Sequence, residues 1–301
     1  MEESAMRTLT TKTKGIILCG FDTIADTDVG LTASKGDFKV AVERAQLHGY
    51  LVGLVSDRPA KILAGKAFEW EMRGPLIIEN GAAIMLDAAD EVRGVEESTR
   101  SFPQLQKLFV ETVQLLDDEG LGYRLISGDS GHVAMHPQSA DWLPESITTI
   151  VIMNGEHEYS LSFSVRNRVT AGKFKGDWEP HTGELRYLSS LAEKVIVFSS
   201  NSHRFRTTLR EDIGACTIAD KSSTKLRCLY LLREYIGPDM PVIMIGSSMS
   251  DFLDSSSAEH YGVSNATDDY RDHCTYCGGK RATQGVIELL EYIIDPHAAY
   301  K

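Results

Sequence analysis

Three aspartates follow the first strongly apolar run of the chain and could take part in nucleophilic or acid–base chemistry. The run is Ile16–Cys19, and Asp22, Asp26 and Asp28 come after it. The carboxyl end of a buried parallel strand is where α/β proteins place their ligands and reacting groups. A carboxylate there could attack a phosphoryl group, carry a proton or bind Mg²⁺. Cys19 is a second kind of candidate nucleophile, because thiolates also attack phosphate esters.

Polar residues also follow the second predicted strand, Tyr50–Val55. The next residues are Ser56, Asp57 and Arg58. A hydroxyl and a guanidinium group can hold a phosphate, although a serine after a strand is more often a helix cap. The carboxylate of Asp57 is unfavourable beside an anion.

A further predicted strand, Val242–Ile245, leads into Ser247 and Asp251. Asp251 offers the carboxylate oxygens that Mg²⁺ prefers. Lys225, at the start of a predicted helix, could neutralise phosphate charge, and Lys221 is the competing choice. A lysine on a helix is otherwise a solvated surface residue.

The elements that would position these residues alternate between strand and helix. Helices are predicted over Asp37–His48, Lys61–Met72, Ser223–Tyr235 and Gln284–Ile294. A short strand, Pro75–Ile78, leads into Asn80-Gly81, a dipeptide typical of hairpin turns. This order predicts right-handed crossovers and a doubly wound parallel sheet of the α/β class.

The pattern changes in the middle of the chain. One amphipathic helix is predicted over Leu105–Asp118, together with short strands at Tyr123–Ile126, His132–Met135, Ile147–Met153, Tyr159–Val165 and Lys194–Phe198. Tyr159–Val165 alternates strictly between apolar and polar residues, as in a sheet covered on one face. We therefore expect a core domain of residues 1–85 and 217–301, with an α+β domain of residues 86–216 inserted into it.

Composition narrows the range of partners. The 301 residues carry a formal net charge of −12, which argues against nucleic acid and anionic membranes. No apolar run approaches the roughly 18 residues of a membrane span, and the first residues lack the apolar centre of a signal peptide. Five scattered cysteines indicate a reducing cytoplasm. Cys274 and Cys277 read as a pair of loop thiols, because a zinc site needs more ligands.

Taken in order, these segments resemble the motifs of the haloacid dehalogenase (HAD) superfamily. The likeness is to Cof-type and mannosyl-3-phosphoglycerate phosphatases, which have a type II cap. The matching segments are Lys14–Asp28, Val55–Arg58, the cap entry Glu79–Ile84, Lys225, Ile245–Asp251, Gly262–Ala266 and Gln284–Val286. The resemblance implies a HAD-like core with an inserted cap, and an aspartate nucleophile with an aspartate acid/base and Mg²⁺.

At the catalytic positions of that family pattern, this chain has residues of other types. The first motif is four apolar residues followed by Asp-x-Asp-x-Thr. With Thr23 as its threonine, the two aspartate positions fall on Cys19 and Phe21. A shift by one residue places Gly20 and Asp22 there instead. A longer shift, with the strand continued through Ile24, gives Asp26-x-Asp28. In the fourth motif Ser247 replaces a metal-binding aspartate, and Asp251 matches the last acidic position.

The resemblance, with these departures, implies an impaired or inactive phosphatase homologue that binds a phosphorylated small molecule such as a sugar phosphate. The phosphate contacts that it implies are Thr23, Ser56, Arg58, Lys225 and Asn265. The alternative is an active Mg²⁺-dependent sugar-phosphate phosphatase, a phosphoric monoester hydrolase, that uses Asp22 or the Asp26–Asp28 pair. A third hypothesis is a subunit retained for its surface within an assembly, and a protein partner stays open.

Overall fold

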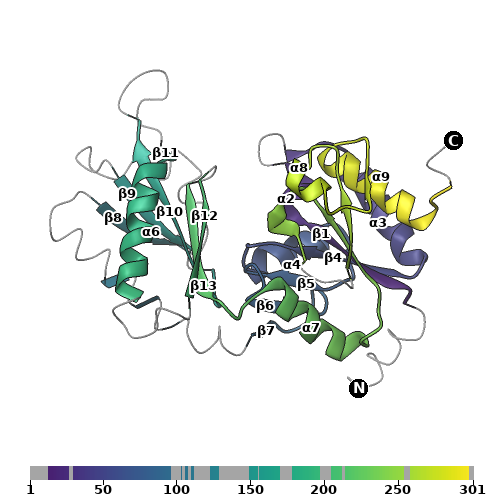
Figure 1. The fold of residues 1–301 in the computed structure, drawn as a ribbon, viewed down its shortest axis with the longest axis horizontal. Coiled ribbons are helices and arrows are strands. Elements are labelled where there is room, and N and C mark those ends of the chain that lie inside the picture. The colour runs from purple at the N-terminus through teal and green to yellow at the C-terminus, as the bar shows by residue number, and fades with distance from the viewer. Residues whose placement is uncertain are drawn as a thin grey trace. The chain divides into compact units, whose positions relative to one another are not determined.

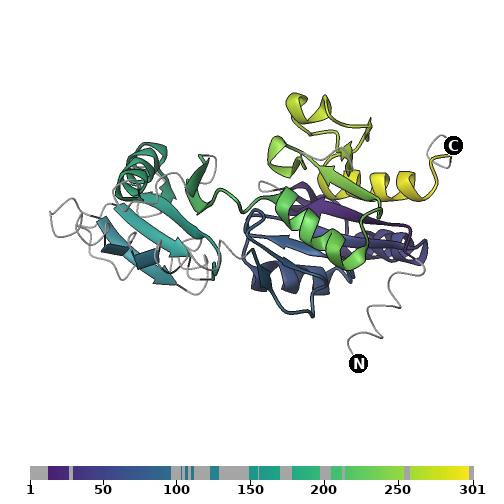
Figure 2. The ribbon, with the colours of Figure 1, turned by 60° about the horizontal axis from the view of Figure 1, so that its bottom comes forward.

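The computed structural model describes residues 13–26, 30–95, 103, 106–107, 110–111, 123–128, 149–154, 156–169, 178–196, 205–211, 214–253 and 258–297. The chain divides into two compact units (Figures 1 and 2). Residues 1–95 and 224–301 form the core unit, and residues 96–223 form the inserted unit. The two units are described separately below.

The described part of the core unit is built on an eight-stranded sheet with the order β16-β15-β14-β1-β4-β5-β6-β7. Its strands are β1 (Gly15–Gly20), β4 (Tyr50–Val55), β5 (Leu76–Ile78), β6 (Ala83–Met85), β7 (Arg93–Gly94), β14 (Val242–Gly246), β15 (Ala258–Gly262) and β16 (Tyr276–Cys277). The strands from β16 to β5 run parallel, and β6 and β7 pair antiparallel. This confirms the predicted doubly wound α/β class.

Helices connect the parallel strands. They are α2 (Phe21–Ile24), α3 (Lys35–Leu47), α4 (Ala60–Glu69), α7 (Lys225–Ile236), α8 (Asp268–Arg271), α9 (Ala282–Ile294) and the 3-10 turn η4 (Met249–Asp251). The hydroxyl of Ser34 caps α3 by accepting from Asp37 N at 3.1 Å, which is why this helix begins before the predicted Asp37. Of the helices described, none has the length and apolar character that crossing a membrane requires.

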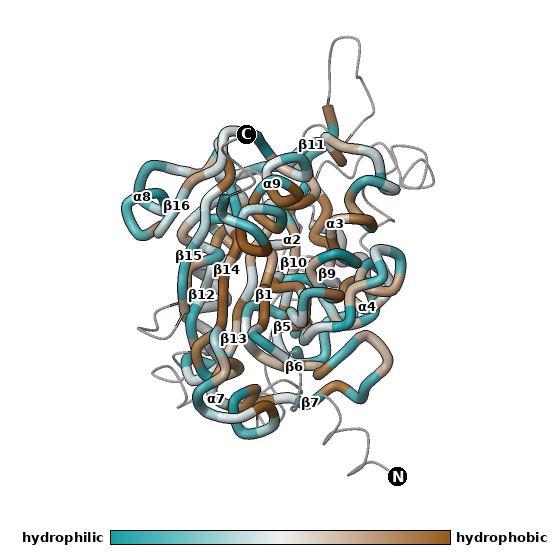
Figure 3. The backbone as a smooth tube through the Cα atoms, turned by 90° about the vertical axis from the view of Figure 1, so that its right-hand side faces the viewer, coloured by the Kyte–Doolittle hydropathy of each residue, from teal (hydrophilic) through white to brown (hydrophobic). Residues whose placement is uncertain are grey.

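The core of this unit forms where apolar strand residues meet the helices. Ile16 and Leu18 of β1 and Met244 of β14 share one buried cluster with Cys228 and Leu229 of α7. Because strand side chains alternate, the intervening residues of β1 face the opposite side of the sheet. Figure 3 shows the hydrophobic character of β1 and β14 at the centre of the unit.

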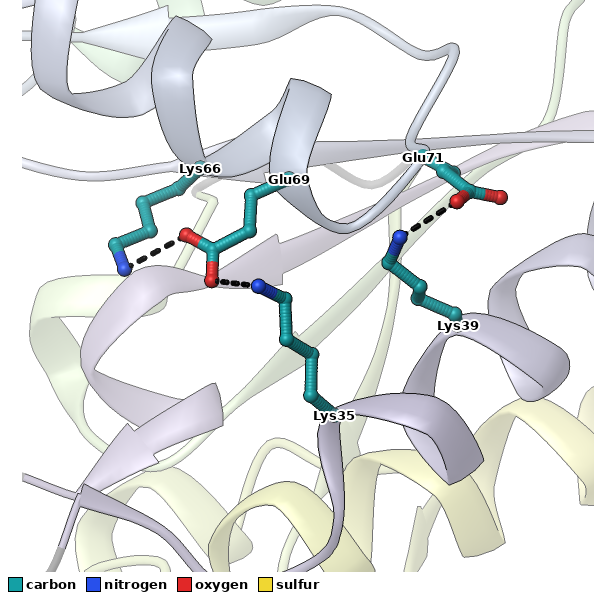
Figure 4. A network of polar contacts seen from close by, with 5 residues as sticks. All are labelled: Lys35, Lys39, Lys66, Glu69 and Glu71. Carbon is teal, nitrogen blue, oxygen red and sulfur yellow. Dashed lines mark hydrogen bonds and ion pairs between the residues drawn. The ribbon is translucent and has the colours of Figure 1, made fainter.

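Ion pairs join α3 to the end of α4 on the surface (Figure 4). Glu69 accepts from Lys35 at 2.5 Å and from Lys66 at 2.9 Å, and Lys39 lies 2.6 Å from Glu71. These side chains are largely in contact with solvent, so the pairs contribute little to stability. The predicted helix Lys61–Met72 ends early at Glu69, because Glu71 takes a left-handed backbone with φ of 59°.

The inserted unit has its own sheet, in which the described strands follow the order β12-β13-β10-β9-β8 and β11 pairs with β10. They are β8 (Tyr123–Gly128), β9 (Thr149–Asn154), β10 (Leu161–Arg168), β11 (Trp178–Pro180), β12 (Phe205–Arg210) and β13 (Ala215–Asp220). In β10, Leu161, Phe163 and Val165 are buried, whereas the serines between them are partly exposed. The alternation predicted for this strand is therefore confirmed.

One strand prediction in this unit is wrong. Residues 194–196 of the predicted strand Lys194–Phe198 belong to α6 (Thr182–Ile196), in which Leu185 and Leu188 are buried one turn apart. A short apolar run does not distinguish a strand from the end of a helix, and that ambiguity misled the prediction. Of the predicted helix Leu105–Asp118, residues 106–107 and 110–111 are helical, and His132–Met135 lies outside the described residues.

Candidate functional site

Three neighbouring strands bring the predicted polar segments to one edge of the core sheet. Cys19 of β1 is opposite Ile245 of β14, and Gly20 is opposite Val55 of β4. The residues that follow these strands, among them Ser56 and Ser247, therefore start at the same carboxyl edge. In doubly wound sheets this edge is the position for ligands.

Asp251 is the centre of a buried polar cluster at this edge. Its Oδ2 accepts from Ser247 N at 2.9 Å and lies 3.0 Å from Thr23 Oγ1, which is also 2.9 Å from Ser247 Oγ. Asp251 and Thr23 are 7% and 1% exposed. A threonine hydroxyl has one proton, which satisfies the carboxylate while the hydroxyl oxygen accepts from the serine. The hydroxyl of Thr23 therefore forms its hydrogen bonds with Ser247 and Asp251 inside the protein.

Gly20 lies directly beneath the carboxylate of Asp251. A Cβ at this position would be 2.6 Å from Asp251 Oδ1 and 2.8 Å from Thr23 Oγ1. The backbone of Gly20, with φ of −60° and ψ of 128°, is one that any residue adopts. Close approach, not backbone conformation, therefore makes glycine necessary here. The carboxylate of Asp251 occupies the space that a side chain on the last residue of β1 would need.

The chain passes from β1 into the short helix α2 within the first motif. β1 ends at Gly20, and Phe21 is buried in α2 with its ring stacked on Trp70 at 5.7 Å. Asp22 comes next, and its Oδ1 lies 3.7 Å from a terminal nitrogen of Arg58. In the register shifted by one residue, Gly20 at the end of β1 and Asp22 in α2 take the two aspartate positions. The ungapped register would require the buried Phe21 to act as acid or base.

Cys19 is unsuited to nucleophilic attack. It is fully buried in β1, and burial together with the carboxylate of Asp251 raises the pKa of its thiol to about 12. At neutral pH the thiol stays protonated, and only the thiolate is nucleophilic.

The two later aspartates do not extend the first strand. The continuous strand through Ile24 is a wrong prediction, because the short helix α2 interrupts the chain after Gly20. The backbone of Asp26 lies in a separate two-residue strand, β2 (Ala25–Asp26), that pairs with β3 (Gly30–Leu31). Asp28 lies outside the described residues.

Arg58 presents an unsatisfied donor at this edge. Its guanidinium carbon lies 4.8 Å from the centre of the Phe21 ring, and its buried Nε has no hydrogen-bond partner in the described part of the chain. The hydroxyl of Ser56 accepts from Arg58 N at 3.2 Å and donates to Asp57 Oδ1 at 3.2 Å. A buried guanidinium N–H without an acceptor is a feature that an anion would satisfy.

The hairpin turn after β5 holds the start of α7. Gly81 has φ of 91°, and a side chain there would overlap the peptide between Thr224 and Lys225. The thiol of Cys228 donates to Gly81 O at 3.3 Å. The hairpin predicted from Asn80-Gly81 is confirmed by the pairing of β5 with β6. The turn fixes the main chain of Lys225 against the core unit.

Asn265 serves a local role in the structure. Its Oδ1 accepts from Ala282 N at 3.0 Å, at the start of α9, where Ala282 has φ of 46°. Tyr270 is not among the residues predicted for the site, and its side chain is fully buried. Its hydroxyl oxygen is 2.5 Å from the point that a Cβ of Gly246 would take. Burial and the nearby carboxylate of Asp251 raise the pKa of Tyr270.

The donor set at this edge does not fit the Mg²⁺ site that the family resemblance implies. Across the described residues, no group of three or more His, Cys, Asp or Glu side chains could hold a metal ion. Oδ2 of Asp251 is already engaged with Ser247 and Thr23. Mg²⁺ requires octahedral oxygen ligands, usually with one or two carboxylates in addition to substrate phosphates. Ser247 contributes a hydroxyl where the family has a carboxylate.

A cavity of about 930 Å³ lies at the opposite, amino edge of the core sheet. Its lining includes Ile16, Leu51, Pro75 and Met240, which lie at or just before the starts of four strands. Four of the residues in Figure 4 belong to the same lining: Lys35, Lys39, Glu69 and Glu71. This cavity is distinct from the predicted phosphate site.

Comparison with known proteins gives a likeness in fold. No model of a protein family matches the sequence, and no curated protein matches it. A haloacid dehalogenase-like hydrolase from Bacteroides thetaiotaomicron aligns with a TM-score of 0.62 and 15% identity, over 93% of this chain and 100% of that chain. A HAD/COF-like hydrolase from Plasmodium vivax aligns with a TM-score of 0.56 and 14% identity, over 97% and 99% of the two chains.

A third solved structure contains ligands. The sucrose-phosphatase from Synechocystis, in complex with sucrose and phosphate, aligns with a TM-score of 0.52 and 10% identity, over 93% of this chain and 98% of that chain. At these identities the likeness establishes the fold alone. The chain has a HAD-like fold, as the sequence analysis predicted.

Proposed function

We propose that this chain is a phosphatase homologue with an impaired or inactive catalytic centre, which binds a phosphorylated small molecule, a sugar phosphate, in the cytoplasm. The observation that carries this proposal is Gly20. At the end of β1, where the HAD motif has its nucleophile, there is a glycine with the carboxylate of Asp251 packed against it. A covalent phosphoryl intermediate needs a carboxylate at that place.

Phosphate binding rests on Arg58 and Ser56, which follow β4 at the same sheet edge, and on Lys225, which the family resemblance implies. Arg58 has a buried Nε without an acceptor, and the contact of its guanidinium with Asp22, at 3.7 Å, is too long for a hydrogen bond. Ser56 supplies a hydroxyl and Lys225 a second positive charge. A phosphate dianion would gain charge-assisted hydrogen bonds from these groups. The sugar phosphate class is supported by the sucrose-phosphatase, whose structure holds sucrose and phosphate.

The alternative is an active Mg²⁺-dependent phosphatase. The observation in its favour is Asp22, a carboxylate at the same sheet edge that is 29% exposed and lies at the acid/base position of the shifted register. In such an enzyme Asp22, or the Asp26–Asp28 pair, would stand in for the missing carboxylates. Mg²⁺ would be the cofactor, bound in part by Asp251.

Phosphate release from a panel of sugar phosphates and p-nitrophenyl phosphate, with and without Mg²⁺, separates the two proposals. We expect no turnover above a contaminant blank in the wild type, Asp22→Asn and Asp26→Asn. Magnesium-dependent turnover that Asp22→Asn abolishes would refute the impaired centre and establish the enzyme.

Binding is measured on the same panel by calorimetry. We expect a sugar phosphate to bind, Arg58→Ala to lose that binding and Arg58→Lys to retain only part of it, since lysine lacks the planar fork of donors. Arg44→Ala is the matched control, because Arg44 is a surface arginine that pairs with Glu291 on α9. If the protein shows no binding and no turnover, both proposals are overturned and the assembly hypothesis is left.

A further inference from the structure

We propose that Cys274 and Cys277 are a site of reversible oxidation, at which a peroxide converts the two thiols to an intramolecular disulfide. The site lies at the carboxyl edge of the core sheet and is independent of phosphate binding.

The two sulfur atoms converge on one point of the backbone. Cys277 lies in β16, opposite Gly262 of β15, and Cys274 lies in the turn between α8 and β16. A Cβ at Gly262 would be 2.9 Å from Cys277 Sγ and 3.2 Å from Cys274 Sγ. Gly262 therefore leaves a space that both sulfurs border.

Exposure distinguishes this pair from the other cysteines. All five cysteines of the chain are in its described part, and none forms a disulfide. Cys19, Cys216 and Cys228 are fully buried, whereas Cys274 and Cys277 are partly exposed. A dissolved oxidant therefore reaches this pair first.

A metal site and a catalytic dithiol fit the geometry less well. In the described residues no third His, Cys, Asp or Glu completes a metal-binding group with the two thiols, and a structural zinc needs four ligands. Cys274 Sγ instead donates to Tyr270 O at 3.3 Å. Burial and the neighbouring Cys277 raise the pKa of Cys274 to about 12, whereas catalytic thiols have a lowered pKa. Cys274 therefore does not have the character of a catalytic thiol.

The oxidation balances with hydrogen peroxide as the oxidant. The thiol of Cys277 loses its proton, and its sulfur attacks a peroxide oxygen; the O–O bond breaks, giving a sulfenic acid and one water. The second sulfur then attacks the sulfenic sulfur, forms the S–S bond and displaces hydroxide, which leaves as a second water with the second thiol proton. The two thiols lose two electrons and two protons in total. A dithiol reductant reverses the change.

Peptide mapping of the full chain tests this proposal. The protein is treated with hydrogen peroxide, denatured, alkylated with N-ethylmaleimide and digested with trypsin. Cleavage after Arg271 and Lys280 releases one peptide that contains Cys274 and Cys277 and no other cysteine. We expect this peptide to be unalkylated and lighter by two hydrogen atoms. After treatment with dithiothreitol it should carry two maleimide groups, while the peptides of Cys216 and Cys228 are alkylated throughout.

Variants identify the two partners. Cys274→Ser and Cys277→Ser should each abolish the change in mass, and Cys228→Ala, which keeps the pair, should retain it. The wild-type peptide decides the question even if a serine variant fails to fold. A doubly alkylated peptide after oxidation would overturn the proposal, as would disulfide-linked dimers on a non-reducing gel or a gain of oxygen atoms in place of the disulfide.

Discussion

Replacing Gly20 by alanine adds one methyl group at a point where the structure has no room for it. The new Cβ would be 2.6 Å from Asp251 Oδ1, 2.7 Å from Asp251 Cγ and 2.8 Å from Thr23 Oγ1. Cβ atoms in proteins essentially never lie within 3.0 Å of such a neighbour. Neither neighbour can move freely, because Asp251 also accepts from Ser247 N at 2.9 Å. The variant must therefore displace a buried hydrogen-bonded carboxylate.

Two opposing contributions set the size of the effect. Alanine restricts the unfolded chain and fits the backbone of Gly20, which stabilises the protein by roughly 0.4–1 kcal/mol. Overpacking costs roughly 1–3 kcal/mol, and weakening a buried hydrogen bond adds roughly 0.5–1.5 kcal/mol. We expect Gly20→Ala to lower the free energy of unfolding by about 2 kcal/mol.

Urea unfolding of the core unit, followed by circular dichroism, measures this change. Gly65→Ala is the matched control, because Gly65 lies inside α4 with no atom within 4 Å of its added Cβ. That control should gain about 1 kcal/mol from helix propensity. In an Asp251→Ala background the penalty of Gly20→Ala should largely disappear. Equal stability of Gly20→Ala and wild type, or the same loss in both backgrounds, would refute the close-packing argument.

Three further substitutions test other parts of the core unit. Lys35 and Lys66 lower the pKa of Glu69, so the stability of this pairing is present above the ordinary carboxyl pKa of about 4.3 and lost as the pH falls through the lowered value. Glu69→Gln should remove that acid-dependent part, less than about 1 kcal/mol, in urea unfolding at several pH values. Tyr270→Phe should keep or slightly raise the melting temperature, because the buried hydroxyl has no hydrogen-bond partner in the described residues; a clear loss would contradict this. Thr224→Ala removes the cap of α7 and should cost about 1 kcal/mol in urea unfolding.

The fold could be predicted because its elements have strong local patterns. Apolar runs such as Val242–Ile245 read as buried strands, and Asn80-Gly81 read as a turn; both are present. The error at Lys194–Phe198 arose where a short apolar run was the only local signal. The boundaries of α3 and α4 depended on caps and on a left-handed residue, and these are weaker signals than periodicity.

The candidate site could be predicted only in outline. The order of strands indicated which segments meet at the sheet edge, but a local pattern does not show which side chains touch. The carboxylate of Asp251 lies against Gly20, a residue far away in the sequence. Likewise, the local pattern does not show that the side-chain oxygen of Asn265 accepts from the main chain of Ala282. Both contacts arise from tertiary packing.

The core unit anchors both ends of the inserted unit, and this affects how freely the insertion can change in evolution. Val95 is the last residue of the first core segment; it donates to Ala82 O at 2.8 Å and is buried in one cluster with Cys228 of α7. The second segment starts at Thr224, whose peptide packs against Gly81. Core contacts thus hold both ends of the insertion. For the core, residues 96–223 behave as one long loop, and the entropy of closing such a loop rises only with the logarithm of its length. The inserted unit can therefore be exchanged, shortened or enlarged in evolution while the sheet that carries the candidate site keeps its architecture.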